Sequence, residues 1–220
     1  MTHNIYLLRH GKVSGKAALY GVTDVDVLPE VNLAISHDLN SGKLAFEHVF
    51  SSPLKRCKSL ARCIYSLNIQ ADSSELLNDV NLIDGLQEMN FGIFDGVDFD
   101  EIYQNKLQWQ MLEKFWQAPS ENTLPQAEPI SAFYQRVEKA WRHICNKIQA
   151  QKIPDQAVEN NSLIVCHGGV IRMILANILK ENIHQVGWYQ RYSIPYGSLT
   201  HLTLSQGQVF IKNIAVPYSH

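Results

Sequence analysis

Short apolar runs of strand length alternate along this chain with stretches of helical spacing. Residues 5–8, 47–52 and 162–166 have the length and composition of buried strands. The stretches 54–67 and 170–180 carry apolar side chains at helical intervals. A repeated strand–turn–helix order is typical of an α/β domain, in which helices cover both faces of a mostly parallel sheet. The sequence therefore predicts a three-layer α/β/α domain.

The middle of the chain departs from this pattern. From 98 to 152 no stretch resembles a strand, and helical segments surround a break that contains Pro119, Pro125 and Pro129. We interpret 98–152 as a helical cap inserted into a single domain that spans 1–220.

The last part of the chain predicts an antiparallel hairpin. Residues 198–204 and 208–214 alternate apolar and polar side chains and flank a short turn. An edge strand of this kind offers backbone groups to a second copy, which makes a homodimer an open alternative to a monomer.

Composition excludes several classes of protein. The net charge is −2 and no basic run exceeds two residues, so we expect no nucleic-acid partner and no anionic membrane surface. The apolar runs are too short to cross a bilayer, and the first residues lack the pattern of a secretory signal. The four cysteines form no C-x-x-C pair, so we expect free thiols, no metal site and a cytoplasmic location.

Chemically active residues follow each of the three predicted strands. In open α/β sheets, ligands bind beyond the carboxyl ends of the strands, so these residues should converge on one edge. Arginine side chains and helix N-termini both bind phosphoryl oxygens, and glycine lets the backbone approach closely. The residues are Arg9, His10 and Gly11 after the first strand, Ser51, Ser52 and Arg56 after the second, and His167, Gly168 and Gly169 after the third.

This mixture predicts an anion pocket with a nucleophile. A neutral histidine in such a pocket can attack phosphorus and form a covalent intermediate, and His10 is placed for this role, with Arg9 stabilising the developing charge. A leaving alkoxide needs a proton, and Glu88, beside a turn rich in aromatic residues and glycine, is the best candidate acid. On composition alone, Asp84, Asp95 and Asp98 are rivals.

At these residues the chain resembles the histidine phosphatase superfamily, which includes the phosphoglycerate mutases. Four segments carry the resemblance in order, over nearly the whole chain: LLRHG, FEHVFSSPLKRCKSLA, LQEMNFGIFDG and LIVCHGGVIR. The resemblance implies a phosphoglycerate mutase-like fold that needs neither a metal nor an organic cofactor. It also implies that His10 becomes the phosphohistidine, that Glu88 donates and then accepts a proton, and that Arg9, Arg56, His167 and Gly168 bind the phosphoryl oxygens.

The chain departs from the family pattern just after the first motif. The family often has an acidic residue, then Thr, and an Asn three residues further on, where this chain has Lys12, Val13 and Lys16. Ser14 is a candidate to replace the hydroxyl group, and Lys16 a candidate to reach the phosphate.

Within the family, several stretches resemble the α-ribazole-5'-phosphate phosphatases of cobalamin synthesis. They are ALYGVTDVDVL, the EMNFG–FDG pair, and FWQAPSENTLPQAE, where Glu128 stands at the place of the subgroup's usual glutamate. Mutases usually carry Arg after the acid, where this chain has Met89, so we favour hydrolysis. Mutase action and broad-specificity phosphatase activity stay open as alternatives.

Trp109 and Trp116 are seven residues apart and therefore share one face of a helix in the predicted cap. They could stack on a flat base of the substrate, or they could simply pack the cap.

Two further alternatives come from other classes of protein. The segment CHGGVIR fits the C-x-x-G-x-x-R phosphate loop of cysteine-dependent phosphatases, with Cys166 as nucleophile and Arg172 as phosphate clamp. The other alternative is a binder of phosphorylated ligands without catalytic activity, which the changes at Val13 and Lys16 keep open.

Overall fold

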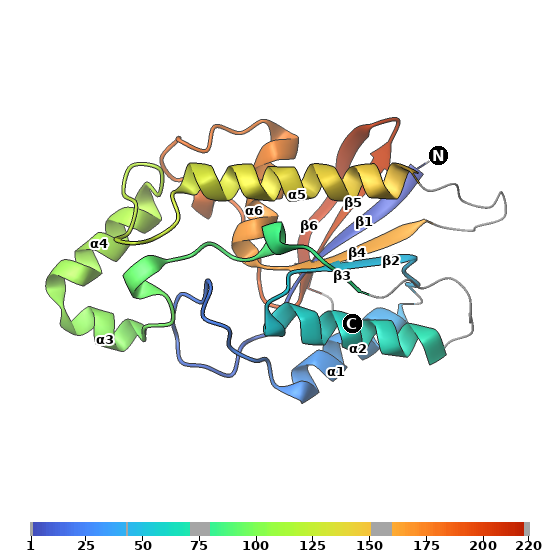
Figure 1. The fold of residues 1–220 in the computed structure, drawn as a ribbon, viewed down its shortest axis with the longest axis horizontal. Helices are drawn as coiled ribbons and strands as arrows, with labels where there is room; N and C mark the ends of the chain where they lie inside the picture. The colour runs from blue at the N-terminus through green and yellow to red at the C-terminus, as the bar shows by residue number, and fades with distance from the viewer. Residues whose placement is uncertain (1, 43, 71–79, 151–159, 218–220) are drawn as a thin grey trace.

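The computed structural model describes residues 2–42, 44–70, 80–150 and 160–217. Its strands are β1 (Thr2–Arg9), β2 (His48–Ser51), β3 (Asn81–Leu82), β4 (Asn161–Cys166), β5 (Ser198–Ser205) and β6 (Gln208–Pro217). They form one sheet in the order β3-β2-β4-β1-β5-β6 (Figure 1). The first four strands in this order pair in parallel, and β5 and β6 pair antiparallel. The predicted mostly parallel sheet and the C-terminal hairpin are confirmed.

Helices cover both faces of this sheet. They are α1 (Pro29–Ser41), α2 (Lys55–Gln70), α3 (Phe99–Gln104), α4 (Lys106–Gln117), α5 (Ile130–Ala150) and α6 (Gly168–Leu179), with short 3-10 turns η1 (Asp84–Leu86), η2 (Gly92–Phe94) and η3 (Trp188–Gln190). Figure 1 shows α1 and α2 on one face and α5 and α6 on the other. The α/β class and its three layers are confirmed.

Successive side chains of β1 point to opposite faces of the sheet, and both faces are buried. Ile5 and Leu7 pack into the core cluster that includes α5 and α6, whereas Tyr6 and Leu8 pack into the cluster that includes α2. Successive side chains of a strand point to opposite faces, so a strand buried on both sides must be apolar throughout.

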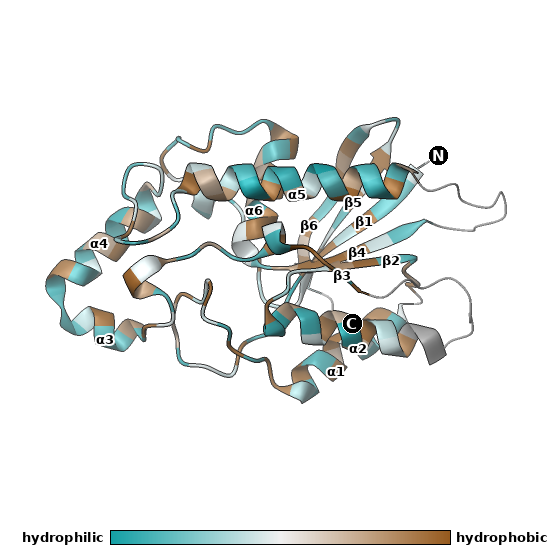
Figure 2. Cartoon of the chain, in the orientation of Figure 1, coloured by the Kyte–Doolittle hydropathy of each residue, from teal (hydrophilic) through white to brown (hydrophobic). Residues whose placement is uncertain are grey.

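The segment predicted as a cap divides into two parts. α5 buries Phe133, Val137, Trp141 and Ile144 along one stripe, and these side chains join the sheet core. Figure 2 shows the alternation of hydrophobic and hydrophilic residues along this helix. α3 and α4 lie beyond the end of the sheet (Figure 1), and we call residues 98–129 the α3–α4 cap.

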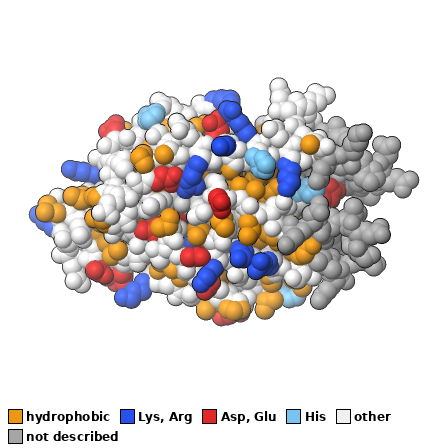
Figure 3. Space-filling model, viewed as in Figure 1, with side chains coloured by type: hydrophobic (Ala, Val, Ile, Leu, Met, Phe, Trp, Pro, Cys, Tyr) orange, Lys and Arg blue, Asp and Glu red, His pale blue; other side chains and the backbone are white. Residues whose placement is uncertain are grey.

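The surface carries charges of both signs. On the face shown in Figure 3, basic and acidic side chains are interspersed. β6 is the outer strand on its side of the sheet, with Phe210 and Val216 about half exposed. The homodimer stays a prediction. Among the described residues, no helix is both long enough and apolar enough to span a bilayer.

Candidate active site

The carboxyl ends of β1, β2 and β4 bring the two predicted histidines to one edge of the sheet. Arg9 pairs with Cys166 in the parallel register of β1 and β4. His10 and His167 therefore leave neighbouring strands side by side, and their ring centroids lie 5.1 Å apart. Ser52 follows β2 at the same edge, where its backbone N–H donates to β4. The expected convergence of the strand ends is present.

His10 is oriented by its own backbone. The side chain is 5% exposed, and Nδ1 lies 2.8 Å from the carbonyl oxygen of Gly11. A carbonyl can only accept a hydrogen bond, so Nδ1 carries the hydrogen and Nε2 keeps its lone pair. Burial holds the pKa of His10 well below its usual range, and the charges of Arg9 and Arg56 lower this pKa further. The ring is therefore neutral, with one nitrogen available as a nucleophile.

His167 is also held neutral, but both of its ring nitrogens have partners. Nδ1 accepts a hydrogen bond of 3.2 Å from Nε of Arg56, and Nε2 lies 2.9 Å from Oγ of Ser52. Because arginine only donates, the hydrogen of His167 is on Nε2 and points at Ser52. Burial and the neighbouring His10 and arginines lower the pKa of His167 well below its usual range.

Arg56 is fully buried, and its hydrogen bonds hold the loop 20–23 against the edge of the sheet. Its terminal nitrogens donate to the carbonyl oxygens of Tyr20, Gly21 and Thr23 at 2.7–3.0 Å. Neither Arg56 nor His167 lines the cavity next to His10. Their contact with phosphoryl oxygens stays a prediction, and in this structure they support the wall beneath the cavity.

Arg9, in contrast, reaches the cavity directly. One of its terminal nitrogens donates to the carbonyl oxygen of Ile194, and the guanidinium carbon lies 3.7 Å from the centroid of the Tyr196 ring. Among the described residues, its buried Nε has no hydrogen-bond partner. Gly168, at the start of α6, lines the cavity beside this guanidinium. This wall therefore offers donors of the kind that bind phosphoryl oxygens.

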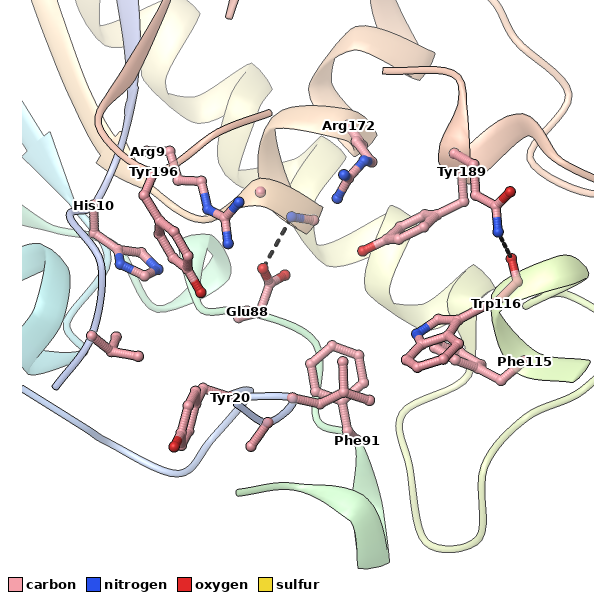
Figure 4. Close-up of a pocket in the computed structure, with 16 residues that line it drawn as sticks. Arg9, His10, Tyr20, Glu88, Phe91, Phe115, Trp116, Arg172, Tyr189 and Tyr196 are labelled. Atoms are coloured by element: carbon pink, nitrogen blue, oxygen red, sulfur yellow. Dashed lines mark hydrogen bonds between the residues drawn. The ribbon is translucent and has the colours of Figure 1, made fainter. Parts of the chain in front are cut away.

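Glu88 joins the same cavity from the segment that follows β3. Its Oε2 accepts a hydrogen bond of 3.0 Å from the backbone N–H of Gly169 (Figure 4). Its Oε1 accepts one of 3.1 Å from the backbone N–H of Met89. A Cβ at Gly169 would lie only 2.2 Å from Oε1, so the absence of a side chain there lets the carboxylate reach the helix N-terminus.

The three rival carboxylates lie elsewhere. Asp95 accepts hydrogen bonds from three backbone N–H groups, and Asp98 caps α3 and binds Lys16. None of Asp84, Asp95 and Asp98 lines the cavity, whereas Glu88 does.

The cavity has a volume of about 300 Å³, and aromatic side chains form much of its wall beside the polar residues. Figure 4 shows Tyr196 among His10, Arg9 and Glu88, and the other labelled aromatic rings around the rest of the space. The aromatic members are Tyr20, Phe91, Phe115, Trp116, Tyr189 and Tyr196. The site thus combines a phosphoryl-binding end with a surface suited to a flat apolar group.

The two predicted stacking residues differ in their distance from the cavity. Trp116 lines it, whereas Trp109 packs behind Trp116 with ring centroids 5.9 Å apart. The indole N–H of Trp109 donates to Glu113 on the same helix. The expected shared face is present, and only Trp116 is in position to touch a ligand directly.

The two residues proposed to compensate for the family departures lie away from the cavity. Lys16 forms an ion pair of 3.1 Å with Asp98 and is largely exposed. Oγ of Ser14 donates to the carbonyl oxygen of Asp26. Val13, in contrast, lines the cavity. The roles suggested for Ser14 and Lys16 near the phosphate stay predictions.

Several cavity residues were not assigned to the site from the sequence, and Arg172 and Tyr189 are two of them. The cysteine-dependent alternative gives Arg172 a role only as a phosphate clamp. Its guanidinium carbon lies 4.7 Å from the centroid of the Tyr189 ring, and Arg172 lines the cavity. Its Nε donates to the carbonyl oxygen of Tyr192. Its place, one turn into the helix that begins at Gly168, was the available signal.

Cys166 does not have the environment of a nucleophile. It is fully buried in β4, it does not line the cavity, and burial raises the pKa of its thiol. A reactive cysteine needs a lowered pKa and access to the substrate. Within the described residues, no group of three or more His, Cys, Asp or Glu side chains has a metal-binding arrangement.

Comparison with known proteins gives a consistent result. The family model described as histidine phosphatase superfamily (branch 1) matches residues 5–216. The broad-specificity phosphatase YOR283W of Saccharomyces cerevisiae is 27% identical over 187 residues, which cover 82% of this chain and 72% of that protein.

Two solved structures illustrate the fold. YhfR of Bacillus stearothermophilus superimposes with a TM-score of 0.79 at 18% identity, over 99% of this chain and all of that one. The alpha-ribazole phosphatase of Shigella flexneri gives a TM-score of 0.73 at 20% identity, over 97% and 96% of the two chains. At these identities the likeness concerns the fold.

Proposed function

Because this chain is a phosphatase that belongs to branch 1 of the histidine phosphatase superfamily, we propose that it hydrolyses phosphomonoesters through a phosphohistidine on His10. The observation that carries the proposal is the hydrogen bond between Nδ1 and the Gly11 carbonyl, which leaves Nε2 unprotonated. Arg9 and Gly168 lie at the same cavity wall and supply donors for phosphoryl oxygens.

In the first step, Nε2 of His10 attacks phosphorus and the bond from phosphorus to the ester oxygen breaks. Protonated Glu88 gives its proton to the departing oxygen, which leaves as the free alcohol. Arg9 and the N-terminus of α6 stabilise the charge on the phosphoryl oxygens from the cavity wall, and Arg56 adds its positive charge from behind that wall. For His167 to donate to these oxygens, its Nε2–H must turn from Ser52 toward the cavity.

In the second step, water releases the phosphoryl group. The Glu88 carboxylate accepts a proton from water while the water oxygen bonds to phosphorus. The bond between phosphorus and Nε2 then breaks, which leaves inorganic phosphate, neutral His10 and protonated Glu88. After both steps His10 and Glu88 have returned to their starting protonation states, and water is the only other reactant.

For the substrate we propose α-ribazole 5'-phosphate. Support comes from the aromatic wall, because Trp116 and its neighbours suit a flat base attached to a sugar phosphate. The fold shared with the Shigella flexneri alpha-ribazole phosphatase is consistent with this choice.

A second candidate is hydrolysis of many phosphomonoesters without strong preference. The likeness to the yeast broad-specificity phosphatase favours it. Mutase action is less well supported, because the residue after the acid is Met89, whereas the resemblance links Arg at that place with mutases.

The mechanism is tested by trapping. Wild-type protein and a His10→Ala variant would be mixed with ³²P-labelled substrate and quenched in alkali, which preserves phosphohistidine and hydrolyses acyl phosphates. Label on the wild type that is lost in His10→Ala supports the proposal. Turnover that persists in His10→Ala would overturn it, and the absence of any turnover would favour a non-catalytic binder.

The substrate is tested by kcat/KM in EDTA for α-ribazole 5'-phosphate against a panel that includes 3-phosphoglycerate and sugar phosphates. A preference of about a hundredfold, or about 2.7 kcal/mol of transition-state discrimination, supports the ribazole assignment. Even turnover across the panel supports the broad-specificity candidate instead.

A further inference from the structure

The side chain of Arg136 on α5 donates hydrogen bonds to the backbone of the segment that carries Glu88. One terminal nitrogen donates to the carbonyl oxygens of Gly85 and Gln87 at 3.1 and 2.7 Å. The other donates to the carbonyl oxygen of Glu88 itself at 2.8 Å. Three carbonyls within four residues are therefore bound by one side chain.

The guanidinium of Arg136 is itself fixed by Glu128. Its Nε donates to Oε1 of Glu128 at 2.7 Å, and a terminal nitrogen donates to Oε2 at 2.9 Å. Such a bidentate pair sets the plane of the guanidinium, which lysine cannot reproduce. The backbone N–H of Glu128 also donates to the carbonyl oxygen of Asn90, so the pair holds both ends of the segment 85–90.

α5 supplies a rigid base for this arrangement. The helix packs into the sheet core through Phe133 and Val137, and the guanidinium carbon of Arg136 lies 4.7 Å from the centroid of the Phe133 ring. A Cβ at Gly85 would lie 2.7 Å from Cβ of Ala140, so the segment lies directly against the helix. The position of Glu88 relative to the sheet is therefore set by α5, which packs on both the sheet and the segment 85–90.

Arg136 touches the backbone of Glu88 but has no hydrogen bond to its carboxylate, which accepts from Met89 and Gly169. We propose that Arg136, held by Glu128, is a positioning residue that aligns Glu88 for proton transfer to the leaving group. The inference rests on the proposed role of Glu88 as the acid. Proton donors act only within a narrow range of distance and angle, so a small shift of this segment should slow that transfer.

The test uses leaving groups of different basicity on the same ring. Phenyl phosphate releases a more basic oxygen than p-nitrophenyl phosphate and depends more on a proton donor. The parameter is kcat/KM, because it reports the step in which the leaving group departs. We expect Arg136→Lys to lower kcat/KM for phenyl phosphate by about thirtyfold or more and for p-nitrophenyl phosphate by less than about threefold.

Glu128→Gln should show the same pattern more weakly, and it serves as the second variant if Arg136→Lys does not fold. Arg142→Lys is the matched control, because Arg142 lies on the same helix and pairs with the partly exposed Glu138. Equal losses for both substrates would mean that Arg136 is only structural and would overturn the inference. So would unchanged values for both substrates.

Glu88→Gln separates this inference from the proposed function. If Glu88→Gln shows no dependence on the leaving group, the role of Glu88 as acid fails, and the positioning inference fails with it. If Glu88→Gln shows the dependence and Arg136→Lys does not, only the positioning inference fails. In the double variant, Arg136→Lys should add little to Glu88→Gln, because the two changes act on one step.

Discussion

The backbone N–H of Gly169 donates a 3.0 Å hydrogen bond to Oε2 of Glu88. This contact joins the segment after β3 to the first turn of α6, two regions 81 residues apart in sequence. The carboxylate thereby occupies the positive end of the helix. The proposed proton donor and the proposed phosphoryl-binding wall therefore share one contact.

We expect Gly169→Ala to impair activity much more than stability. The new Cβ would lie 2.2 Å from Oε1 of Glu88, at the far end of a flexible side chain that can rotate away. Displacing the acid should lower kcat by about a hundredfold, while the melting temperature falls by about 4 °C or less. Circular dichroism and steady-state kinetics check this, and wild-type kcat in a folded Gly169→Ala protein would contradict it.

Cys166→Ala and His10→Ala should have opposite consequences. Cys166 is fully buried in the core, so its truncation should lower stability by about 1 kcal/mol and change kcat/KM by less than about threefold. His10→Ala should lower kcat/KM by at least about a thousandfold, because it removes the proposed nucleophile. Measuring kcat/KM for both variants under the same conditions tests this. A large loss in Cys166→Ala with a small loss in His10→Ala would assign catalysis to the cysteine.

The sequence was sufficient to predict the layers of the fold and the residues at the strand ends. Apolar runs such as 162–166 require burial on both faces, and parallel strands place their carboxyl ends at one edge. His10 and His167 were found in this way because each directly follows its strand.

Other features depend on tertiary contacts that have no local pattern. β3 contains only Asn81 and Leu82 and is too short to show a period. Helical spacing in α5 was visible, but the pattern does not say whether a helix packs on the sheet or on the cap. The contact of Arg136 with the Glu88 segment joins residues 48 positions apart, so spacing alone could not reveal it.

The rate should tolerate mildly acidic conditions. His10 must be neutral to attack, and burial with Arg9 and Arg56 nearby lowers its pKa well below the usual value of about 6.5. The acid limb of kcat/KM should therefore lie well below pH 6.5. A pH profile on stably folded protein checks this, and a half-maximal point near pH 6.5 on the acid side would contradict it.

Stability should fall over the acidic range in which the unfolded chain gains protons. His10 and His167 both have lowered pKa values when folded, so the unfolded state binds more protons below about pH 6.5. The free energy of unfolding should then decrease as the pH falls, by up to about 1.4 kcal/mol per pH unit for each histidine. Urea titrations between pH 7 and 5 measure this, and His167→Gln should show a shallower slope than wild type.

Trp116→Ala and Trp109→Ala should separate contact with substrate from packing of the α3–α4 cap. Trp116 lines the cavity, and its backbone carbonyl accepts a hydrogen bond from Gln190. Trp109 packs behind it and is the matched control for loss of an indole.

We expect Trp116→Ala to raise KM for α-ribazole 5'-phosphate by about tenfold, or about 1.4 kcal/mol, and KM for a small alkyl phosphate by much less. Trp109→Ala should raise the first KM by less than about threefold, since it acts only through its neighbour. Equal effects of Trp116→Ala on both substrates would mean that the ring packs the cap and does not recognise the base.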